Sequence, residues 1–278
     1  ANAHWPAAAR REREAAGRPV LTFNRTNTFV NQVVNPIRQA DKAIKARIDD
    51  DETDPTLAKV VDGLLRKIQR QSMSEAVYGH ILDCQAGCGI GWLRICNDYR
   101  TDTSFDQDIF IEKVDNPLSV GWDPASRDPV RSDAMWKFVT EMMPLGTFRA
   151  RWPDAAEESA DDPRPADVSD TGLSWNTGND IRVVEYYKKV QTTRTIARLA
   201  GGKSKDITDL PSEVVAGLPI ETTRKVKTHR VEKYMVSGAE VLEGPSEVPG
   251  SYIPLVPALG GEVALDNGAS RSCVLCLA

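Results

Sequence analysis

The chain has 278 residues, 41% of them hydrophobic and 27% charged, a balance typical of a soluble globular protein that buries a core. Its formal net charge of −5 disfavours the basic surface of a nucleic-acid-coating protein, and no apolar run approaches the roughly 20 residues that cross a membrane. Five cysteines, an odd number, favour reduced intracellular thiols over a disulfide framework. The chain begins with Ala and has no signal-type apolar segment, so we expect its natural N-terminus to lie upstream.

The first part of the chain carries apolar residues at helical spacing. We expect one helix over residues 7–16, which are charged and rich in alanine, and a second whose apolar face includes Val34. Asn24 is a suitable N-cap for this second helix, and Pro36 is expected to kink or end it. Residues 43–51 then predict a short strand that runs into an acidic loop.

Residues 54–99 predict two helices packed onto a pleated layer. The first helix begins at Asp54-Pro55, a capping residue followed by proline at the first helical position. Its apolar side chains form one stripe, made of Leu57, Val60, Val61, Leu64, Leu65 and Ile68. The second helix places Met73, Ala76, Val77, His80, Ile81 and Cys84 on one face, and the glycines that follow are expected to end it, with Gly87 as its C-cap.

From residue 90 the apolar pattern changes to a period of two. Strands are predicted over residues 91–99, 108–114 and 117–122, joined by polar turns. Residues 133–144 are ambiguous between strand and helix, and residues 145–155 predict a short helix that ends at Pro153.

The second half predicts mostly strands after a long polar segment. Residues 153–180 are acidic and rich in Pro, Ser and Asp, which is typical of a flexible loop or linker. The strands predicted beyond it cover residues 181–190, 194–200, 229–238 and 240–244, with a helical insertion within 204–219. Residues 249–266 contain too many prolines for a central strand. The whole pattern predicts an α+β fold, with N-terminal helices packed on mostly antiparallel strands.

Gly87, Gly89 and Gly91 raise the possibility of a phosphate-binding loop. A dinucleotide fingerprint has the spacing G-x-G-x-x-G after a strand and before a helix, so that free N–H groups meet the pyrophosphate. Here the spacing is G-x-G-x-G and the predicted order is helix, glycines, strand. The sequence therefore favours a plain helix-to-strand junction, and we predict no cofactor.

A metal site is the main alternative hypothesis. His80, Cys84 and Cys88 follow one another at one-turn spacing, and Cys273 and Cys276 form a C-x-x-C pair. Imidazole and thiolate groups of this kind hold zinc. However, the two groups lie at opposite ends of the chain, and small residues such as His80 and Cys84 are ordinary on an apolar helix face. We therefore predict no metal but keep a metal-binding protein or enzyme built on the His80/Cys84/Cys88 cluster as the alternative.

No catalytic constellation is recognisable, and we predict no catalytic residue and no enzyme activity. The three histidines are His4, His80 and His229, and neither G-x-S-x-G nor H-E-x-x-H occurs. Acidic groups at residues 49–51 and 161–162 are typical of solvated loops. The basic stretch over residues 222–234 lacks interleaved aromatic residues before Tyr234, so it indicates an exposed strand face and not a base-stacking platform.

Several stretches resemble one family, the portal proteins of short-tailed, double-stranded-DNA bacteriophages (podoviruses). The resemblance covers residues 17–263 and rests on six segments in the family's order: GRPVLTFNRTNTFVNQVVNPIRQ, CGIGWLRICNDY, VGWDPASRDPVRSDAMW, FRARWPDA, IRVVEYY and PGSYIPLVPALGGEV. It implies the outer wing of a portal subunit, near the N-terminus of the family's full-length chain.

The resemblance also implies a role. Portals are homo-oligomeric rings, usually of twelve subunits, at one capsid vertex of the virion, and they are assembled in the bacterial cytoplasm. They contact capsid and scaffolding proteins, the terminase motor and tail proteins, and double-stranded DNA passes through them without sequence-specific contacts. No membrane and no enzyme activity are implied, since ATP hydrolysis belongs to the terminase.

The resemblance divides the chain into four parts. Residues 1–152 are expected to hold the helical segment and the first strands of the wing, 153–180 the acidic loop, and 181–265 the β-rich part of the wing. Residues 266–278 do not resemble the family, which continues there into stem and clip. We therefore expect a truncated portal subunit, such as the product of a frameshift, a premature stop or a prophage remnant.

Overall fold

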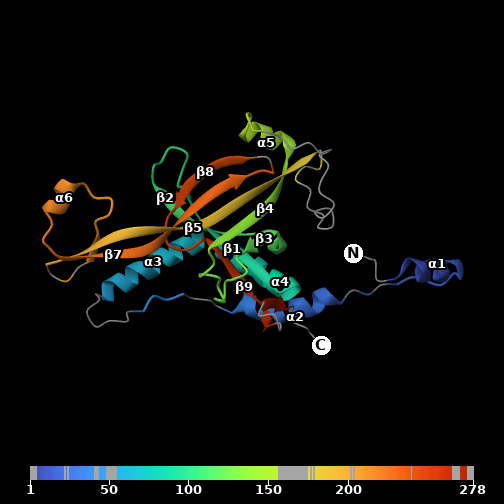
Figure 1. Cartoon of the computed structure of the whole chain (residues 1–278). Coiled ribbons are helices and arrows are strands. Elements are labelled where there is room, and N and C mark those ends of the chain that lie inside the picture. The colour runs from blue at the N-terminus through green and yellow to red at the C-terminus, as the bar shows by residue number, and fades with distance from the viewer. Residues whose placement is uncertain are drawn as a thin grey trace.

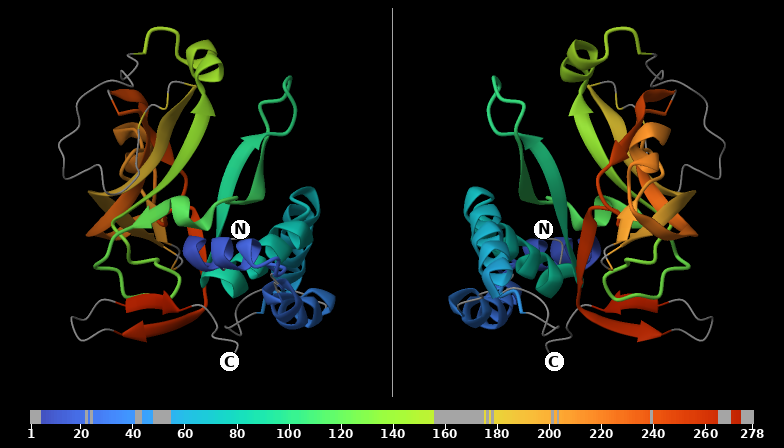
Figure 2. Two further views of the ribbon diagram at one scale, coloured as in Figure 1. Left: turned by 90° about the vertical axis from the view of Figure 1, so that its right-hand side faces the viewer. Right: turned by 90° about the vertical axis from the view of Figure 1, so that its left-hand side faces the viewer.

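The computed structural model describes residues 5–273 of the chain, apart from 22, 24, 41–43, 48–54, 156–174, 176, 178, 201, 203, 239 and 265–269. Its main body has three layers, which are helices, a small sheet and a larger sheet, as the side views in Figure 2 show. The fold is α+β with antiparallel strands, as the sequence predicted. Of the helices described, none is long and apolar enough to cross a membrane.

Four helices precede the first strand. They are α1 (Ala7–Ala15), α2 (Thr26–Gln39), α3 (Pro55–Gln71) and α4 (Ser74–Cys88). α4 packs on the small sheet, α2 packs on α4 with Val34 buried, and α3 contacts both α4 and the second strand. α1 buries no residue and lies apart from the body (Figure 1).

The region around α2 differs from the sequence prediction at two points. The helix runs through Pro36 to Gln39, so the proline does not end it. Pro36 stands in the last turn, where its missing N–H removes a single backbone bond and the Ala40 N–H still reaches the Pro36 carbonyl oxygen at 3.2 Å. Residues 44–47 form no strand, and the rest of the predicted strand, like Asn24, lies outside the described residues.

The helix-to-strand junction after α4 forms as predicted, but its C-cap is Gly89 instead of Gly87. Gly89 adopts a left-handed conformation with φ of 84°, and its N–H donates to the Gln85 carbonyl oxygen at 3.1 Å. Glycine takes this conformation without the steric cost that a side chain would add, which explains why the helix ends there. Gly87 lies within the last turn of α4.

The small sheet has three antiparallel strands in the order β2-β1-β9. They are β1 (Ile90–Tyr99), β2 (Gln107–Lys113) and β9 (Leu255–Leu259). β9 pairs with β1 over Ile90–Arg94, while β2 pairs with β1 over Leu93–Tyr99, so β1 joins the two outer strands and has a partner on both sides at Leu93 and Arg94. β9 carries Pro257 at the edge of the sheet, in keeping with the prediction that this proline-rich segment forms no central strand.

The larger sheet follows the order β3-β4-β5-β7-β8, and β6 pairs with β5 off this path. Its strands are β3 (Val120–Trp122), β4 (Trp136–Pro144), β5 (Asp180–Leu199), β6 (Ser204–Asp206), β7 (Ile220–Val236) and β8 (Val241–Val248). Three short helices lie between them, namely η1 (Pro117–Ser119), α5 (Leu145–Arg151) and α6 (Ser212–Ala216). The ambiguous segment 133–144 thus contains a strand, β4.

β5 is one strand of 20 residues where the sequence predicted two shorter ones. It pairs with β7 from Val184 to Leu199, so the two strands form a long ribbon that projects beyond the other strands and ends near α6 (Figure 1). The basic residues of the stretch 222–234 lie on β7, and Arg224, Lys225 and Lys227 are exposed, as predicted for a strand face.

Two buried clusters hold the sheets. The main core lies between the small and the large sheet and contains Trp92, Val139, Tyr187, Val231 and Leu255 among others. A second cluster forms where α5 covers the start of β5, with Phe148, Trp152, Ile181 and Val183. The rings of Phe148 and Trp152 are 5.3 Å apart, a separation typical of a favourable aromatic pair.

Two predicted segments fall largely outside the description. Residues 156–174, most of the predicted acidic loop, are not among the described residues, and neither are 265–269 and 274–278 of the tail. β10 (Gly261–Ala264), which precedes the first of these tail gaps, pairs antiparallel with β11 (Ser270–Cys273), which lies between them. The proposed four-part division of the chain therefore stays a prediction.

Candidate functional site

The His80/Cys84/Cys88 cluster is held by hydrogen bonds on α4. His80 Nε2 lies 3.5 Å from Cys84 Sγ and 3.3 Å from the Val114 carbonyl oxygen, and Cys88 Sγ donates to the Cys84 carbonyl oxygen at 3.0 Å. Burial raises the pKa of the Cys84 thiol, and Cys88 and Asp83 add to the rise, so Cys84 stays a thiol at neutral pH. Within the described ranges, no group of three or more His, Cys, Asp and Glu is placed to hold a metal.

The glycines at the α4–β1 junction serve close packing. A Cβ on Gly91 would stand 2.5 Å from the Ile81 carbonyl oxygen and 2.8 Å from Ile81 Cγ2. The Gly89 carbonyl oxygen accepts a hydrogen bond from the Gly260 N–H at 2.8 Å, which ties the junction to the chain just beyond β9. With its amide bonded to Gln85, Gly89 presents no free donor to a phosphate. The junction thus lets a helix, β1 and β9 meet at short range.

A network of charged residues joins the two sheets. Arg94 on β1 donates to Glu185 on β5 at 2.6 Å and to Glu112 on β2 at 2.9 Å. Lys233 on β7 also pairs with Glu185, and the Tyr187 hydroxyl donates to the same carboxylate at 2.9 Å. Glu185 is only 7% exposed, so this carboxylate stands between two cations from different sheets with little water around it.

The protonation states follow from this arrangement. Burial would raise the pKa of Glu185, but Lys233 and Arg94 outweigh burial and hold it below its usual value. Burial and the Glu185 charge raise the pKa of Tyr187, which therefore stays protonated and donates. Burial also raises the pKa of the adjacent Cys96 thiol to about 11, although Arg94 opposes the rise. Cys96 thus stays a thiol at neutral pH and is not an activated nucleophile.

Lys137 on β4 is a second buried charge between the sheets. It is 2% exposed, its Nζ donates to the Leu255 carbonyl oxygen at 2.7 Å, and the Trp92 ring lies 6.0 Å away. Burial lowers the pKa of Lys137 to about 8, and the nearby Lys189 adds to this effect. This hydrogen bond links β4 of one sheet to β9 of the other.

Asp108 on β2 fastens α3 to the small sheet. Its carboxylate accepts hydrogen bonds from Lys67 at 2.9 Å and Gln71 at 3.0 Å, both on α3, and from Arg100 Nε at 3.0 Å. The bonds from Arg100, Lys67 and Gln71 hold the pKa of Asp108 well below its usual range. Nearer the Pro55 end of α3, the Asp62 carboxylate accepts a hydrogen bond from the Ala46 N–H at 2.5 Å.

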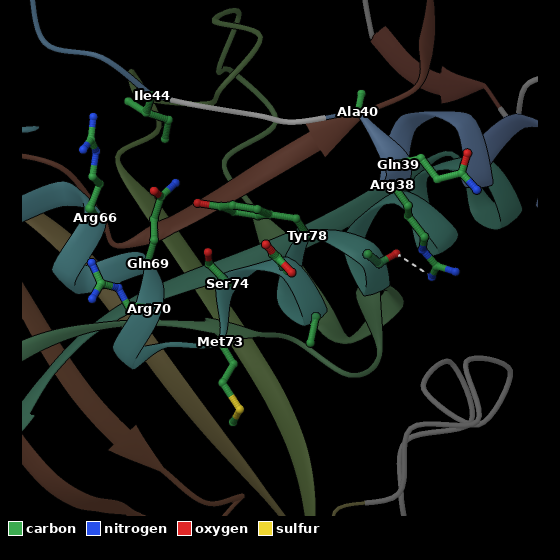
Figure 3. A pocket seen from close by; sticks show the side chains of 13 residues that line it. Arg38, Gln39, Ala40, Ile44, Arg66, Gln69, Arg70, Met73, Ser74 and Tyr78 are labelled. Carbon is green, nitrogen blue, oxygen red and sulfur yellow. Dashed lines mark hydrogen bonds between the residues drawn. The ribbon is translucent and has the colours of Figure 1, made fainter.

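A cavity of about 1000 Å³ opens between the end of α2 and the α3–α4 turn. Figure 3 shows Arg66, Gln69 and Arg70 projecting from α3 on one side of the cavity, Tyr78 of α4 between, and Arg38 of α2 on the other side. Arg38 donates to the Gly79 carbonyl oxygen at 3.2 Å and pairs with Asp83 outside the cavity. Guanidinium groups that stay fully charged suit contact with acidic groups but supply no general base.

The apolar stripe of α3 is the largest departure from expectation. Leu57, Val60 and Leu64 are 55%, 62% and 52% exposed, and Val61 is exposed as well, whereas Leu65 and Ile68 are half-buried. The stripe predicted from helical spacing exists, but only its last turn meets the body of the subunit. Uncovered apolar faces of this kind mark contact surfaces in folded proteins.

The polar clusters of the described residues are therefore structural links between elements, and the α3 stripe is the candidate contact surface. Sequence reasoning missed the Arg94–Glu185–Lys233 network and the Asp108 anchor. A usable signal existed for Glu185, because it stands in phase with Ile181, Val183 and Tyr187 on the inward face of β5. A charge at such an inward position indicates a buried partner.

Comparison with known proteins agrees with the resemblance noted in the sequence. The family described as phage P22-like portal protein matches residues 1–275 of the chain, which includes most of the tail that looked atypical. The portal protein of Acyrthosiphon pisum secondary endosymbiont phage 1 is 24% identical over 263 residues. That alignment covers 90% of this chain and 36% of the relative, so the chain spans little more than a third of that protein's length. Since the family match covers nearly the whole chain, the protein belongs to the phage P22-like portal protein family.

Proposed function

We propose that this chain forms the outer wing of a phage portal subunit and that it acts by assembly, without catalysing a reaction. The match to the portal family over residues 1–275 carries this proposal. The structure supports this proposal because the polar clusters among the described residues join helices and strands to one another. Its uncovered α3 face is the kind of surface that a second subunit covers.

The proposed assembly is a homo-oligomeric ring in the virion, with twelve copies in the intact family. Capsid, scaffolding, terminase and tail proteins are its proposed partners, and double-stranded DNA passes through the ring without sequence-specific contacts. The net charge of −5 supports this last point, because a strongly basic lining would hold the phosphate backbone by counterion release and slow its movement.

Oligomer formation by the purified chain tests the proposal. Sedimentation velocity over a range of protein concentrations, with negative-stain electron microscopy of the largest species, is expected to show association into rings or ring segments. An ATPase assay on the same preparation is expected to show no turnover above that of heat-denatured protein. A chain that stays monomeric at every concentration would overturn ring formation by this chain. ATP hydrolysis clearly faster than in the heat-denatured sample would overturn the non-enzymatic role.

A further inference from the structure

The N-terminal arm, which we define as residues 18–29, is a second uncovered apolar surface besides the α3 stripe. Phe23 and Leu21 are 80% and 60% exposed, and Phe29 in the first turn of α2 is 49% exposed. Large apolar side chains gain little from these positions in a lone subunit, since each leaves about half or more of its surface in water. The described part of the chain therefore leaves the large apolar side chains of the arm mostly in water.

α1 is attached to this arm and not to the body. The Trp5 indole N–H donates to the Leu21 carbonyl oxygen at 3.2 Å, and Arg13 lies 4.8 Å above the Trp5 ring. Arg13 also donates to the Pro19 carbonyl oxygen at 3.2 Å. These contacts shape α1 and residues 18–21 into one small unit that extends away from the three layers (Figure 1).

The arm and the stripe lie at opposite ends of the subunit. Figure 1 shows α1 beyond one end of the body and the Pro55 end of α3 toward the other. Two different surfaces at opposite ends associate head to tail, and such heterologous contacts close into rings when the rotation between copies permits.

We infer that the arm of one copy packs on the α3 stripe of the next copy, with Leu21, Phe23 and Phe29 covering Leu57, Val60 and Leu64. This inference rests on the proposed ring and names the surfaces that would join neighbouring subunits. The Asp108 anchor fits the arrangement, since it fixes one end of α3 to the small sheet while leaving the stripe free for the partner.

Charge substitution in the full 278-residue chain tests the contact. Leu64→Glu and Phe23→Glu are each expected to raise the concentration at half-association at least about tenfold, because a carboxylate would be buried against apolar side chains. Lys59→Glu is the control. It places a carboxylate on the same helix, at an exposed position about 100° or more around from each stripe residue, and it should leave association unchanged.

Cysteine cross-linking tests the head-to-tail geometry. A chain carrying both Phe23→Cys and Val60→Cys is expected to form a ladder of covalent oligomers under mild oxidation. An equal mixture of the two single variants is expected to stop at dimers, and either single variant alone should match the wild-type background of its native thiols.

The outcomes separate the two proposals. Wild-type rings that persist in Leu64→Glu would overturn the arm–stripe contact and leave the proposed ring intact. Dimers from Val60→Cys alone would indicate a symmetric contact between two α3 helices, and an intramolecular cross-link in the double variant would place the arm on its own α3. Either result would overturn the inference, and a wild-type chain that never associates would overturn the proposed ring together with it.

Discussion

Gly91 sets how closely α4 can approach β1. Its missing side chain leaves room for the Ile81 carbonyl oxygen, which would otherwise stand 2.5 Å from a Cβ. The backbone and the side chain in this contact both belong to Ile81, which is buried, so neither can move aside cheaply. The helical layer and the small sheet are thus joined at a point where only glycine fits.

Gly91→Ala is expected to destabilise the chain by about 1–3 kcal/mol through this overpacking. Gly87→Ala is the control, because a Cβ at Gly87 meets nothing within 4 Å and Gly87 lies inside the last turn of α4. Alanine favours helix over glycine, so this control should be neutral or stabilising by up to about 1 kcal/mol. Urea denaturation of both variants measures the difference, and equal midpoints would contradict the packing argument.

Lys137 is a buried residue whose effect on stability depends on pH. Its pKa is lowered to about 8 by burial, so between that value and the ordinary lysine value the unfolded chain binds more protons than the folded chain. Stability from this group therefore rises as the pH increases through that window. Below it, both states are protonated and the folded chain carries the full cost of a buried charge.

Comparison of the wild type with Lys137→Met isolates this effect, because other titrating groups are shared. The stability of the wild type relative to the variant is expected to rise by up to about 3 kcal/mol between about pH 8 and pH 10.5. The lost hydrogen bond to the Leu255 carbonyl oxygen costs the variant a constant amount at every pH. Parallel pH curves for the two proteins would show that Lys137 keeps an ordinary pKa.

At the scale of elements, the local sequence pattern predicted those features that residues close together in the sequence determine. The helix start predicted at Asp54-Pro55 lies within one residue of the observed start of α3. The strand predicted from the alternating pattern of residues 91–99 is observed as β1. The length of β5 was not predictable, because Gln191–Thr193 look like a polar break and are carried by pairing with β7. Pairing partners lie far away in sequence, so period-two patterns show a strand but not its extent.

The α3 stripe shows a different limit of sequence reasoning. Helical spacing identified an apolar face correctly, but spacing cannot tell whether a face is covered by the same chain or by another copy. Only the anchor at the far end of the helix, where Lys67 and Gln71 reach Asp108, decides which part of α3 touches the body. That anchor joins residues about forty positions apart, beyond the reach of local patterns.

Asp108→Asn tests the anchoring of α3. The neutral amide loses the charge that attracts Lys67 and Arg100, so hydrogen exchange of the α3 amides is expected to accelerate while exchange in β5 and β7 stays unchanged. Because the Asp108 pKa is lowered, the wild-type anchor is present above the ordinary Asp range and is lost as the pH falls below it.

Asp98→Asn provides the control for this anchor. Asp98 is exposed and stands opposite Asp108 in the β1–β2 pairing, where its carboxylate accepts from the Tyr99 N–H. Its substitution should leave exchange in α3 at the wild-type rate. Equal acceleration in both variants would mean that the β1–β2 hairpin as a whole loosens, and that the three bonds to Asp108 do not hold the helix.

For the molecule as a whole, the polar network between the sheets decides how the layers stay in register. The apolar core between the sheets is large, yet apolar contacts alone allow one layer to slide on the other. Glu185 on β5 pairs with Arg94 on β1 and with Lys233 on β7. These two ion pairs fix the position of β1 relative to β5 and β7. If neighbouring wings press on one another in a ring, this network is the part of the subunit that would resist shear between layers.

Glu185→Gln removes the charge that both cations share while keeping the side chain's shape. We expect a loss of about 2–4 kcal/mol in the free energy of unfolding, because breaking a buried ion pair leaves uncompensated charge and here Arg94 keeps Glu112. Glu112→Gln removes the other, half-exposed partner of Arg94 and should cost less than about 1 kcal/mol.

The Glu185 pKa is lowered, so its contribution is present above the ordinary glutamate pKa and is lost as the pH falls through the folded value. The two variants should therefore differ most at neutral pH and converge in acid, and denaturant curves that keep the same gap at both pH values would contradict a charge-based link between the sheets.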